Sequence, residues 1–202
     1  MENHLKSYIT NRLQESQQVF QLMLLDEQLV TATQNAAEVC INALKSGNKI
    51  LLSGNGGSAA DCQHIAGELV SRFEFDRPGL PAMALTVDSS ILTAIGNDYG
   101  YEKLFERQLQ TLGKPGDVFF AYSTSGKSPN ILRALEFVKS NDIQSVGFTG
   151  NRQGPMKSLC DYLLEVPSAE TPRIQEGHLV LGHIICGLIE NALFSELRPN
   201  KT

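Results

Sequence analysis

The chain has no block of five or more like charges, no low-complexity tract and no CxxC pair of cysteines. Its net charge is −5 and its pI is near 5.4, so it lacks the basic surface that sequence-independent nucleic-acid binding requires. No apolar run reads as long enough to span a membrane, and the opening MENHLKSYIT has no basic region followed by an apolar core. We therefore expect no nucleic-acid partner, no membrane partner and a cytoplasmic protein.

The length and composition indicate a single domain. The 202 residues are 42% hydrophobic and 19% charged, which is typical of one well-buried globular unit. The four cysteines, at 40, 62, 160 and 186, stand singly and read as buried thiols in a reducing compartment. Cys62 lies close to His64 and could be a nucleophile, but nothing near it in the sequence would activate a thiolate.

Apolar stretches of strand length alternate with stretches of helical periodicity. We expect strands at 50–52, 82–85, 118–122, 144–149 and 162–166, and helices at 2–25, 26–45, 59–70, 91–95, 101–112, 129–139, 156–159 and 171–197. This alternation predicts an α/β domain whose parallel sheet has helices on both faces and binds ligands at the carboxyl ends of its strands. The apolar stripe of the first helix packs either against another subunit or as an extra layer on the monomer.

The most informative stretch is Lys49–Arg72, which reads as a strand, a loop of small residues (Ser53–Ser58) and a helix. Such a loop places backbone N–H groups and the positive end of a helix where an anion can bind. The helix carries His64 and Glu68 four residues apart, and therefore on one face. A second polar, glycine-containing loop is expected at Gly96–Gly100.

The same pattern returns at 118–139. A strand leads into the hydroxyl-rich loop Ser123–Ser128, and the next helix begins with Pro129. Hydroxyl groups, loop N–H groups and a helix N-terminus suit a phosphate. The spacing is not that of a Walker A sequence, so a nucleotide is not indicated. A plain strand-to-helix loop rich in serine is the alternative.

The last helix carries Gln175, His178 and His183 in an otherwise apolar run. At 100° per residue, Gln175 and His183 lie about 80° apart and can face one site, whereas His178 lies about 140° from His183. We treat His4 and His178 as structural. His183 could equally be a core histidine with satisfied hydrogen bonds.

If the last helix meets the helix of His64 and Glu68, two imidazoles, a carboxylate and the amide of Gln175 come together. That set suits zinc or another divalent ion with room for substrate oxygens. Without a metal, the same groups suit proton transfer at a sugar carbon next to a carbonyl. The residues leave both possibilities open.

Five motifs in this order resemble the sugar isomerase (SIS) domain family, and within it the isomerases that act on sedoheptulose 7-phosphate. The motifs are SGNGGSAADCQH at 53–64 with the Glu68 that follows, AIGNDYG at 94–100, STSGKSPN at 123–130, RIQEGH at 173–178, and His183. The resemblance covers nearly the whole chain, including both leading helices.

The resemblance implies a five-stranded parallel sheet in a flavodoxin-like three-layer sandwich with two extra N-terminal helices. Residues 1–47 would be a helical oligomerisation region and residues 48–202 the sugar-phosphate-binding core. It further implies a homotetramer with active sites between subunits and one zinc ion per subunit. The implied zinc ligands are His64, Glu68, Gln175 and His183.

The resemblance also assigns roles to individual residues. Glu68 and His183 would be the acid/base pair that moves a proton between C1 and C2 through an enediol. Asp61, one turn before His64, is a candidate helper whose role stays open. The implied substrate contacts are Asn55, Gly56, Gly57, Glu68, Asn97, Asp98 and Gln175, together with Ser123, Thr124, Ser125 and Ser128 around the phosphate. The expected product is D-glycero-D-manno-heptose 7-phosphate, a precursor of lipopolysaccharide core or other surface glycans.

Relatives with the same domain but other functions are the alternatives. A tetrameric adaptor that binds the replication initiator protein lacks the pair equivalent to Glu68 and His183, which this chain keeps. A sugar-phosphate-sensing regulator would add a DNA-binding module, and an aminotransferring relative would add a glutaminase domain. This chain has room for neither, so we expect the isomerase.

Overall fold

The computed structural model describes residues 2–152 and 154–199 of the chain. Within them, five parallel strands form one sheet in the order β2-β1-β3-β4-β5. The strands are β1 (Ile50–Ser53), β2 (Ala82–Ala84), β3 (Val118–Tyr122), β4 (Gln144–Gly150) and β5 (Tyr162–Val166). This is the doubly wound order of flavodoxin-like folds, with its switch point between β1 and β3. The predicted fold class is confirmed.

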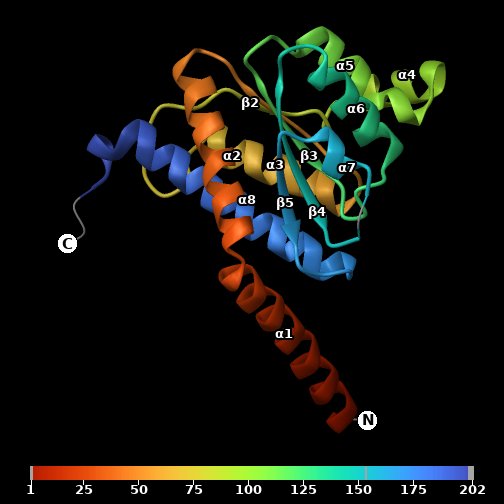
Figure 1. Ribbon diagram of the computed structural model, residues 1–202, viewed down its shortest axis with the longest axis vertical. Coiled ribbons are helices and arrows are strands. Elements are labelled where there is room, and N and C mark those ends of the chain that lie inside the picture. Colours follow the sequence, from red (N-terminus) through yellow and green to blue (C-terminus); the bar gives the residue numbers. More distant parts are fainter. Residues whose placement is uncertain (1, 153, 200–202) are drawn as a thin grey trace.

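Helices cover both faces of the sheet (Figure 1). One face packs against α2 (Glu27–Lys45), α3 (Gly57–Val70), α8 (Thr171–Phe194) and the end of α1 (Glu2–Leu25). The other face packs against α4 (Ser89–Tyr99), α5 (Leu104–Leu112), α6 (Pro129–Lys139) and α7 (Met156–Leu159). Short 3₁₀ turns, η1 (Tyr101–Lys103) and η2 (Ser195–Leu197), precede α5 and follow α8. The second of the two leading helices is therefore part of the layer over the sheet.

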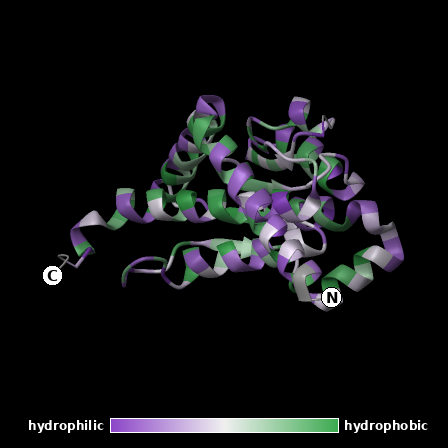
Figure 2. Ribbon diagram, turned by 90° about the horizontal axis from the view of Figure 1, so that it is seen from below, coloured by the Kyte–Doolittle hydropathy of each residue, from purple (hydrophilic) through white to green (hydrophobic). Residues whose placement is uncertain are grey.

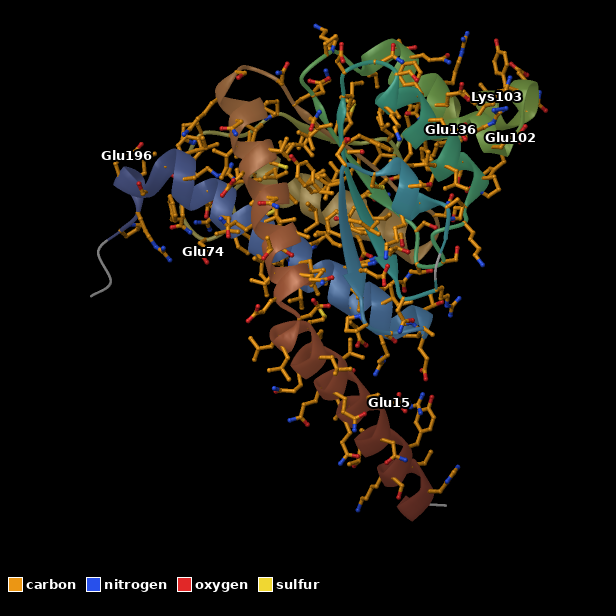
Figure 3. The ribbon with its side chains drawn as sticks, viewed as in Figure 1. Glu15, Glu74, Glu102, Lys103, Glu136 and Glu196 are labelled. Carbon is orange, nitrogen blue, oxygen red and sulfur yellow. The ribbon has the colours of Figure 1, made fainter. Side chains whose placement is uncertain are left out.

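The two cores follow from the alternation of side chains along each strand. In β1, Ile50 and Leu52 join the core of α2, α3 and α8, whereas Leu51 joins the core of α4, α5 and α6. All three are fully buried because β1 is central. The charged side chains of Glu74, Glu136 and Glu196 lie outside the core (Figure 3). The sheet therefore presents only the loops at its strand ends for chemistry.

Helix α1 is the exception to this compact packing, because it projects away from the sheet (Figure 1). Its base is fixed where the guanidinium of Arg173 on α8 donates to the Arg12 carbonyl and to the Ser16 hydroxyl, at 2.5 and 2.6 Å. Farther out, apolar side chains are exposed, including Leu5 at 58% and Tyr8 at 60%. Figure 2, coloured by hydropathy, shows hydrophobic and hydrophilic residues interspersed along the helices.

The predicted loop at Gly96–Gly100 is wrong, because α4 continues through Tyr99. The Asp88 carboxylate starts the helix by accepting the N–H of Ile91 at 2.9 Å. A Cβ at Gly96 would meet no atom within 4 Å, so no close contact requires glycine at this position of the helix. The helix stops only at Gly100, whose φ of +92° suits glycine.

The last helix also corrects the statement that no segment could span a membrane. Thr171–Leu197 is long and apolar enough to do so by length and composition alone. Its inner side, however, is part of the core against the sheet, with Ile174, Ile185 and Ile189 each at most 1% exposed. Core helices of this kind meet the same criterion, so the composition does not identify a membrane segment.

Candidate active site

Helices α3 and α8 lie side by side and form the framework of the site. They run in the same direction, since Gln175 lies against Gly57 near their starts and Gly182 lies against Ile65 about two turns farther on. A Cβ at Gly182 would come within 2.7 Å of the Ile65 side chain. This glycine therefore allows an approach close enough for side chains of the two helices to touch.

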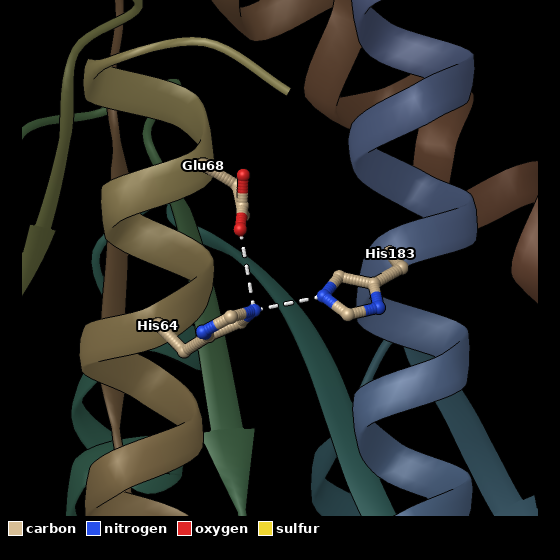
Figure 4. A group of neighbouring side chains, drawn as sticks. All are labelled: His64, Glu68 and His183. Carbon is tan, nitrogen blue, oxygen red and sulfur yellow. Dashed lines mark hydrogen bonds and ion pairs between the residues drawn. The ribbon is translucent and has the colours of Figure 1, made fainter. Parts of the chain in front are cut away.

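His64, Glu68 and His183 meet across this contact (Figure 4). The Nε2 atoms of the two histidines are 2.8 Å apart, so one ring donates a proton and the other accepts it. The His64 Nε2 is also 3.2 Å from a Glu68 carboxylate oxygen. The His64 side chain is 46% exposed and that of Glu68 is 24% exposed, so a substrate can reach both.

The three residues fit a divalent metal ion. Their ligand atoms all lie within 4.8 Å of one another, so small side-chain movements would bring them within the separation of about 4 Å or less that two atoms at about 2 Å from one zinc ion have. Two imidazoles and one carboxylate are a donor set that zinc prefers, and three protein ligands leave a position for substrate. The structure brings these three predicted residues together.

Gln175, the fourth predicted ligand, lies elsewhere in this structure. Its side-chain amide is directly against Gly57 at the start of α3, where any side chain at position 57 would collide with it. Gly57 is two helical turns before His64, so the amide faces the loop that begins at Ser53. Gln175 thus lies between this loop and the histidine pair.

Two ionisable groups around the cluster have perturbed pKa values. Burial lowers the pKa of His183, the neighbouring His64 lowers it further, and Glu68 opposes the shift. His183 is therefore neutral at pH 7, as a metal ligand or an exchanging acid/base requires. Burial raises the pKa of Asp61 to about 6, although His64 opposes the shift. One Asp61 oxygen has no hydrogen-bond partner among the described residues.

The loop Ser123–Ser128 has the form of a phosphate site. The Ser123 and Ser128 hydroxyls are 2.9 Å apart, and the Lys127 N–H donates to the Ser125 hydroxyl at 3.2 Å. Gly126 adopts φ +65°, which turns the loop back toward the start of α6. Hydroxyls, loop N–H groups and the N-terminus of α6 thus belong to one short loop, which is the composition that suits an anion. Thr124 is half-buried beside them.

Asn55 joins the two sides of the switch point. Its side-chain amide exchanges two hydrogen bonds with Asn130 of α6, at 3.0 and 2.9 Å, and its oxygen also accepts the Tyr101 hydroxyl at 2.9 Å. The loop after β1 and the loop after β3 are thereby held together. Gly56 and Gly57 beside it are exposed, which leaves their backbone open to a ligand.

Asn97 and Asp98 lie in the last turn of α4, exposed, and the Asn97 amide donates to the Asp98 carboxylate at 2.8 Å. Tyr101, which contacts Asn55, follows three residues after Asp98. The pair therefore lies at a helix end that the sequence analysis treated as a loop, ending three residues before the tyrosine that contacts Asn55.

The four cysteines are free thiols. Cys62 is fully buried, and burial raises its pKa well above the usual value, with the neighbouring Asp61 raising it further. Such a thiol is not a nucleophile. The reading of Cys62 as a structural residue is confirmed.

Several residues near the site were missed by the sequence analysis. Asn130 was within a quoted motif but received no role, and the aromatic ring of Phe73 stacks on His183. Glu190, seven residues after His183 and so on the same face of α8, was also overlooked. A carboxylate within the apolar run IICGLIENALF was the available signal.

Comparison with known proteins gives consistent matches. The family model described as SIS domain matches residues 17–150. Among curated proteins, the phosphoheptose isomerase of Burkholderia pseudomallei strain 1710b is 65% identical over 97% of this chain and 100% of that protein. The phosphoheptose isomerase of Aneurinibacillus thermoaerophilus is 59% identical over 94% of this chain and 96% of that protein.

Solved structures give the same match. The phosphoheptose isomerase of Neisseria gonorrhoeae superposes with a TM-score of 0.87 at 39% sequence identity, covering 93% of this chain and 99% of that one. That of Francisella tularensis also has a TM-score of 0.87, at 34% identity, covering 92% and 97%. The likeness therefore extends over sequence, fold and almost the full length of the chains compared.

Proposed function

The chain belongs to the SIS domain family and, within it, to the phosphoheptose isomerases, and from this premise we propose its substrate, its proton-transfer groups and its metal. The resemblance drawn from the motifs is confirmed, and the chain is a sugar-phosphate isomerase. The substrate is D-sedoheptulose 7-phosphate and the product is D-glycero-D-manno-heptose 7-phosphate. The observation that carries the proposal is the meeting of Glu68 and His183 across two helices, with His64 between them.

The reaction needs two kinds of proton movement. The Glu68 carboxylate removes a proton from C1 of the open-chain ketose. The neutral His183 imidazole gives its N–H proton to the C2 oxygen, which forms the enediol, and becomes an imidazolate. Glu68 then returns its proton to C2, while His183 takes the proton of the C1 hydroxyl. The product is the aldose, and both residues end in the protonation states in which they started.

The proposed metal is one zinc ion per subunit, held by His64, Glu68 and His183 with Gln175 as a fourth ligand. Zinc would polarise the two substrate oxygens as a Lewis acid. The donor set and the close spacing of the first three residues support this proposal. Gln175 needs only a change of side-chain rotamer to leave Gly57, because its amide ends a flexible chain.

The remaining predicted residues are proposed to bind the substrate. Ser123, Thr124, Ser125 and Ser128 grip the phosphate, and the backbone of Asn55–Gly57 with the Asn97–Asp98 pair orients the sugar hydroxyls. The buried Asn130 supports this assignment, since it fixes the amide of Asn55. A loop grip on the phosphate contributes equally to substrate and transition state, so it acts mainly on KM.

We also propose a homotetramer with its active sites between subunits, in which residues 1–47 are the main contact region. An apolar groove of about 530 Å³ lies between α1, α2 and α8, lined by residues such as Phe20, Leu24, Val30 and Ile184. Ile184, next to His183, is 46% exposed. A second copy covering this groove would also cover one side of the histidine pair, which supports a shared site. Light scattering of the purified protein tests the tetramer.

The proposed cellular role is the first step of heptose precursor synthesis in the cytoplasm, for lipopolysaccharide core or other surface glycans. This follows from the chemistry of the product, a heptose phosphate with a free aldehyde that later enzymes can activate. Loss of surface heptose in a cell that lacks this protein tests it.

The decisive experiment measures turnover of sedoheptulose 7-phosphate by the purified protein, with added zinc and with a chelator. We expect conversion that the chelator abolishes and zinc restores. Conversion that is indifferent to the chelator would remove the metal from the proposal and leave Glu68 and His183 as plain acid and base. No conversion by a folded protein in either condition would favour the adaptor function instead.

The matched variant is Glu68→Gln, which keeps the size of the side chain but removes its basic oxygen. Loss of a general base lowers kcat by about 10²- to 10⁴-fold, and the oligomeric state should not change because Glu68 is partly exposed at the site. Turnover retained by a folded Glu68→Gln protein would refute the role given to this carboxylate.

A further inference from the structure

A buried carboxylate on α8 organises the segment that follows α3. Glu190 is 0% exposed, and it accepts the backbone N–H of Phe73 at 3.0 Å and of Glu74 at 2.7 Å. Its third partner is the Arg77 guanidinium, whose Nε donates at 2.9 Å. Two adjacent backbone amides and one charged side chain therefore hold the start of this segment against α8.

The same arginine binds the end of α3. Its Nη2 donates to the carbonyl of Glu68 at 2.8 Å, and its Nη1 donates to the carbonyl of Leu69 at 2.6 Å. These carbonyls belong to the last turn of the helix, where donors from within the helix are missing. Arg77 thus fixes the turn that carries Glu68 and the segment that carries Phe73 in one network.

This network holds the aromatic ring of Phe73 against His183 of the site. The Phe73 ring stacks on the His183 imidazole, with centroids 5.5 Å apart and planes 27° apart. His64 approaches the same imidazole edge-on, at 5.0 Å and 60°. Gly187, one turn after His183, lies beside the ring, since a Cβ there would be in ordinary van der Waals contact with Phe73 at 3.4 Å. The imidazole is therefore held on one face by Phe73 and met at its Nε2 by His64.

We propose that Phe73 is a positioning residue for the isomerisation: held by Glu190 and Arg77, its ring fixes the plane of the His183 imidazole at the angle that meets His64 and Glu68. The second side-chain torsion of a histidine has broad energy wells. A half-buried imidazole without a stacking partner would therefore spend part of its time turned away. This proposal rests on the proposed function.

The test compares Phe73→Leu, Phe73→Tyr and the matched control Phe75→Leu. Phe75 lies in the same segment and is 4% exposed, more buried than Phe73. Each protein is assayed for kcat and KM with sedoheptulose 7-phosphate, for Zn²⁺ affinity by chelator competition, for the visible spectrum of bound Co²⁺, and for melting temperature.

We expect Phe73→Leu to lower kcat and Zn²⁺ affinity about three- to tenfold, the loss that one aromatic contact predicts, with KM changed less than about twofold. The Co²⁺ spectrum should shift, because the ligand geometry relaxes. Phe73→Tyr keeps the ring and should restore all of these values. Phe75→Leu should lower the melting temperature more than Phe73→Leu, while its kcat and Zn²⁺ affinity stay at wild-type values.

Wild-type kcat and Zn²⁺ affinity in Phe73→Leu would overturn the proposal. So would a loss that Phe73→Tyr fails to restore, or an equal loss of kcat in Phe75→Leu. If the wild-type protein itself has no turnover, the proposed function fails. The Zn²⁺ affinity and Co²⁺ spectrum of Phe73→Leu against wild type then still decide whether Phe73 orients His183.

Discussion

His178 should make the protein sensitive to acid, and the variant that tests this is His178→Phe. The imidazole is 0% exposed and packs edge-on against Tyr122 and Phe148, with ring centroids 5.7 and 5.8 Å away. Burial lowers its pKa to about 4, although the backbone of Thr149 opposes the shift. Neither ring nitrogen makes a hydrogen bond of normal geometry with a described residue, so we attribute the shift to burial.

The sign and size of the change in unfolding free energy with pH follow from the difference in proton binding between the folded and unfolded states. The pKa in the unfolded chain is near 6.5, so below that pH the unfolded state binds a proton that the folded state does not. The stability that the neutral ring contributes is complete above pH 6.5 and is lost as the pH falls toward 4. A shift of this size corresponds to about 3 kcal/mol of unfolding free energy.

Urea unfolding of both proteins at pH 7 and at pH 4.5, at one fixed protein concentration, measures the effect. The phenyl ring of the His178→Phe variant keeps an aromatic edge against the same two rings but cannot bind a proton. The contributions of Glu190, Asp61 and the other carboxylates are common to both proteins and cancel in the difference. Wild type should lose about 2 kcal/mol more than His178→Phe over this range. Parallel losses would refute the assignment of a buried neutral imidazole.

Two further predictions concern the site. In metal-free protein, the raised pKa of Asp61, about 6, should lower stability as the pH rises from about 4 to 6; Asp61→Asn should lack this decline in melting temperature, and an identical decline would contradict it. Ser123→Ala should raise KM for sedoheptulose 7-phosphate, by about tenfold for one charge-assisted hydrogen bond, with little change in kcat. A loss of kcat at constant KM would instead place Ser123 in the chemical step.

Local sequence signals predicted most of the fold, because the relevant physics acts over a few residues. The β1 run Ile50–Leu52 is buried on both sides, and Pro129 starts α6 as predicted. The prediction of a loop at Gly96–Gly100 was wrong, and the reason is also local. The N-cap at Asp88 and the apolar spacing up to Ile95 outweigh a single glycine within the helix.

The site was predictable only in part. His64 and Glu68 share a helix face, and the angle between Gln175 and His183 follows from helix geometry, so their candidacy could be argued from spacing. The arrangement around them could not. Phe73 reaches His183 through a segment without helix or strand, whose path depends on Glu190 more than 100 residues away. A segment without helix or strand has no periodic sequence pattern from which its position could be predicted.

The close packing of α3 on α8 determines the geometry of the site. The 2.8 Å contact between His64 and His183 requires the two helix axes to approach closely at the neighbouring residues Ile65 and Gly182. Any side chain at position 182 would push Ile65 away, because its Cβ would lie 2.7 Å from that side chain. Interiors are packed too densely to absorb such a shift locally. A residue with no chemical group therefore sets the distance on which the proposed proton transfer depends.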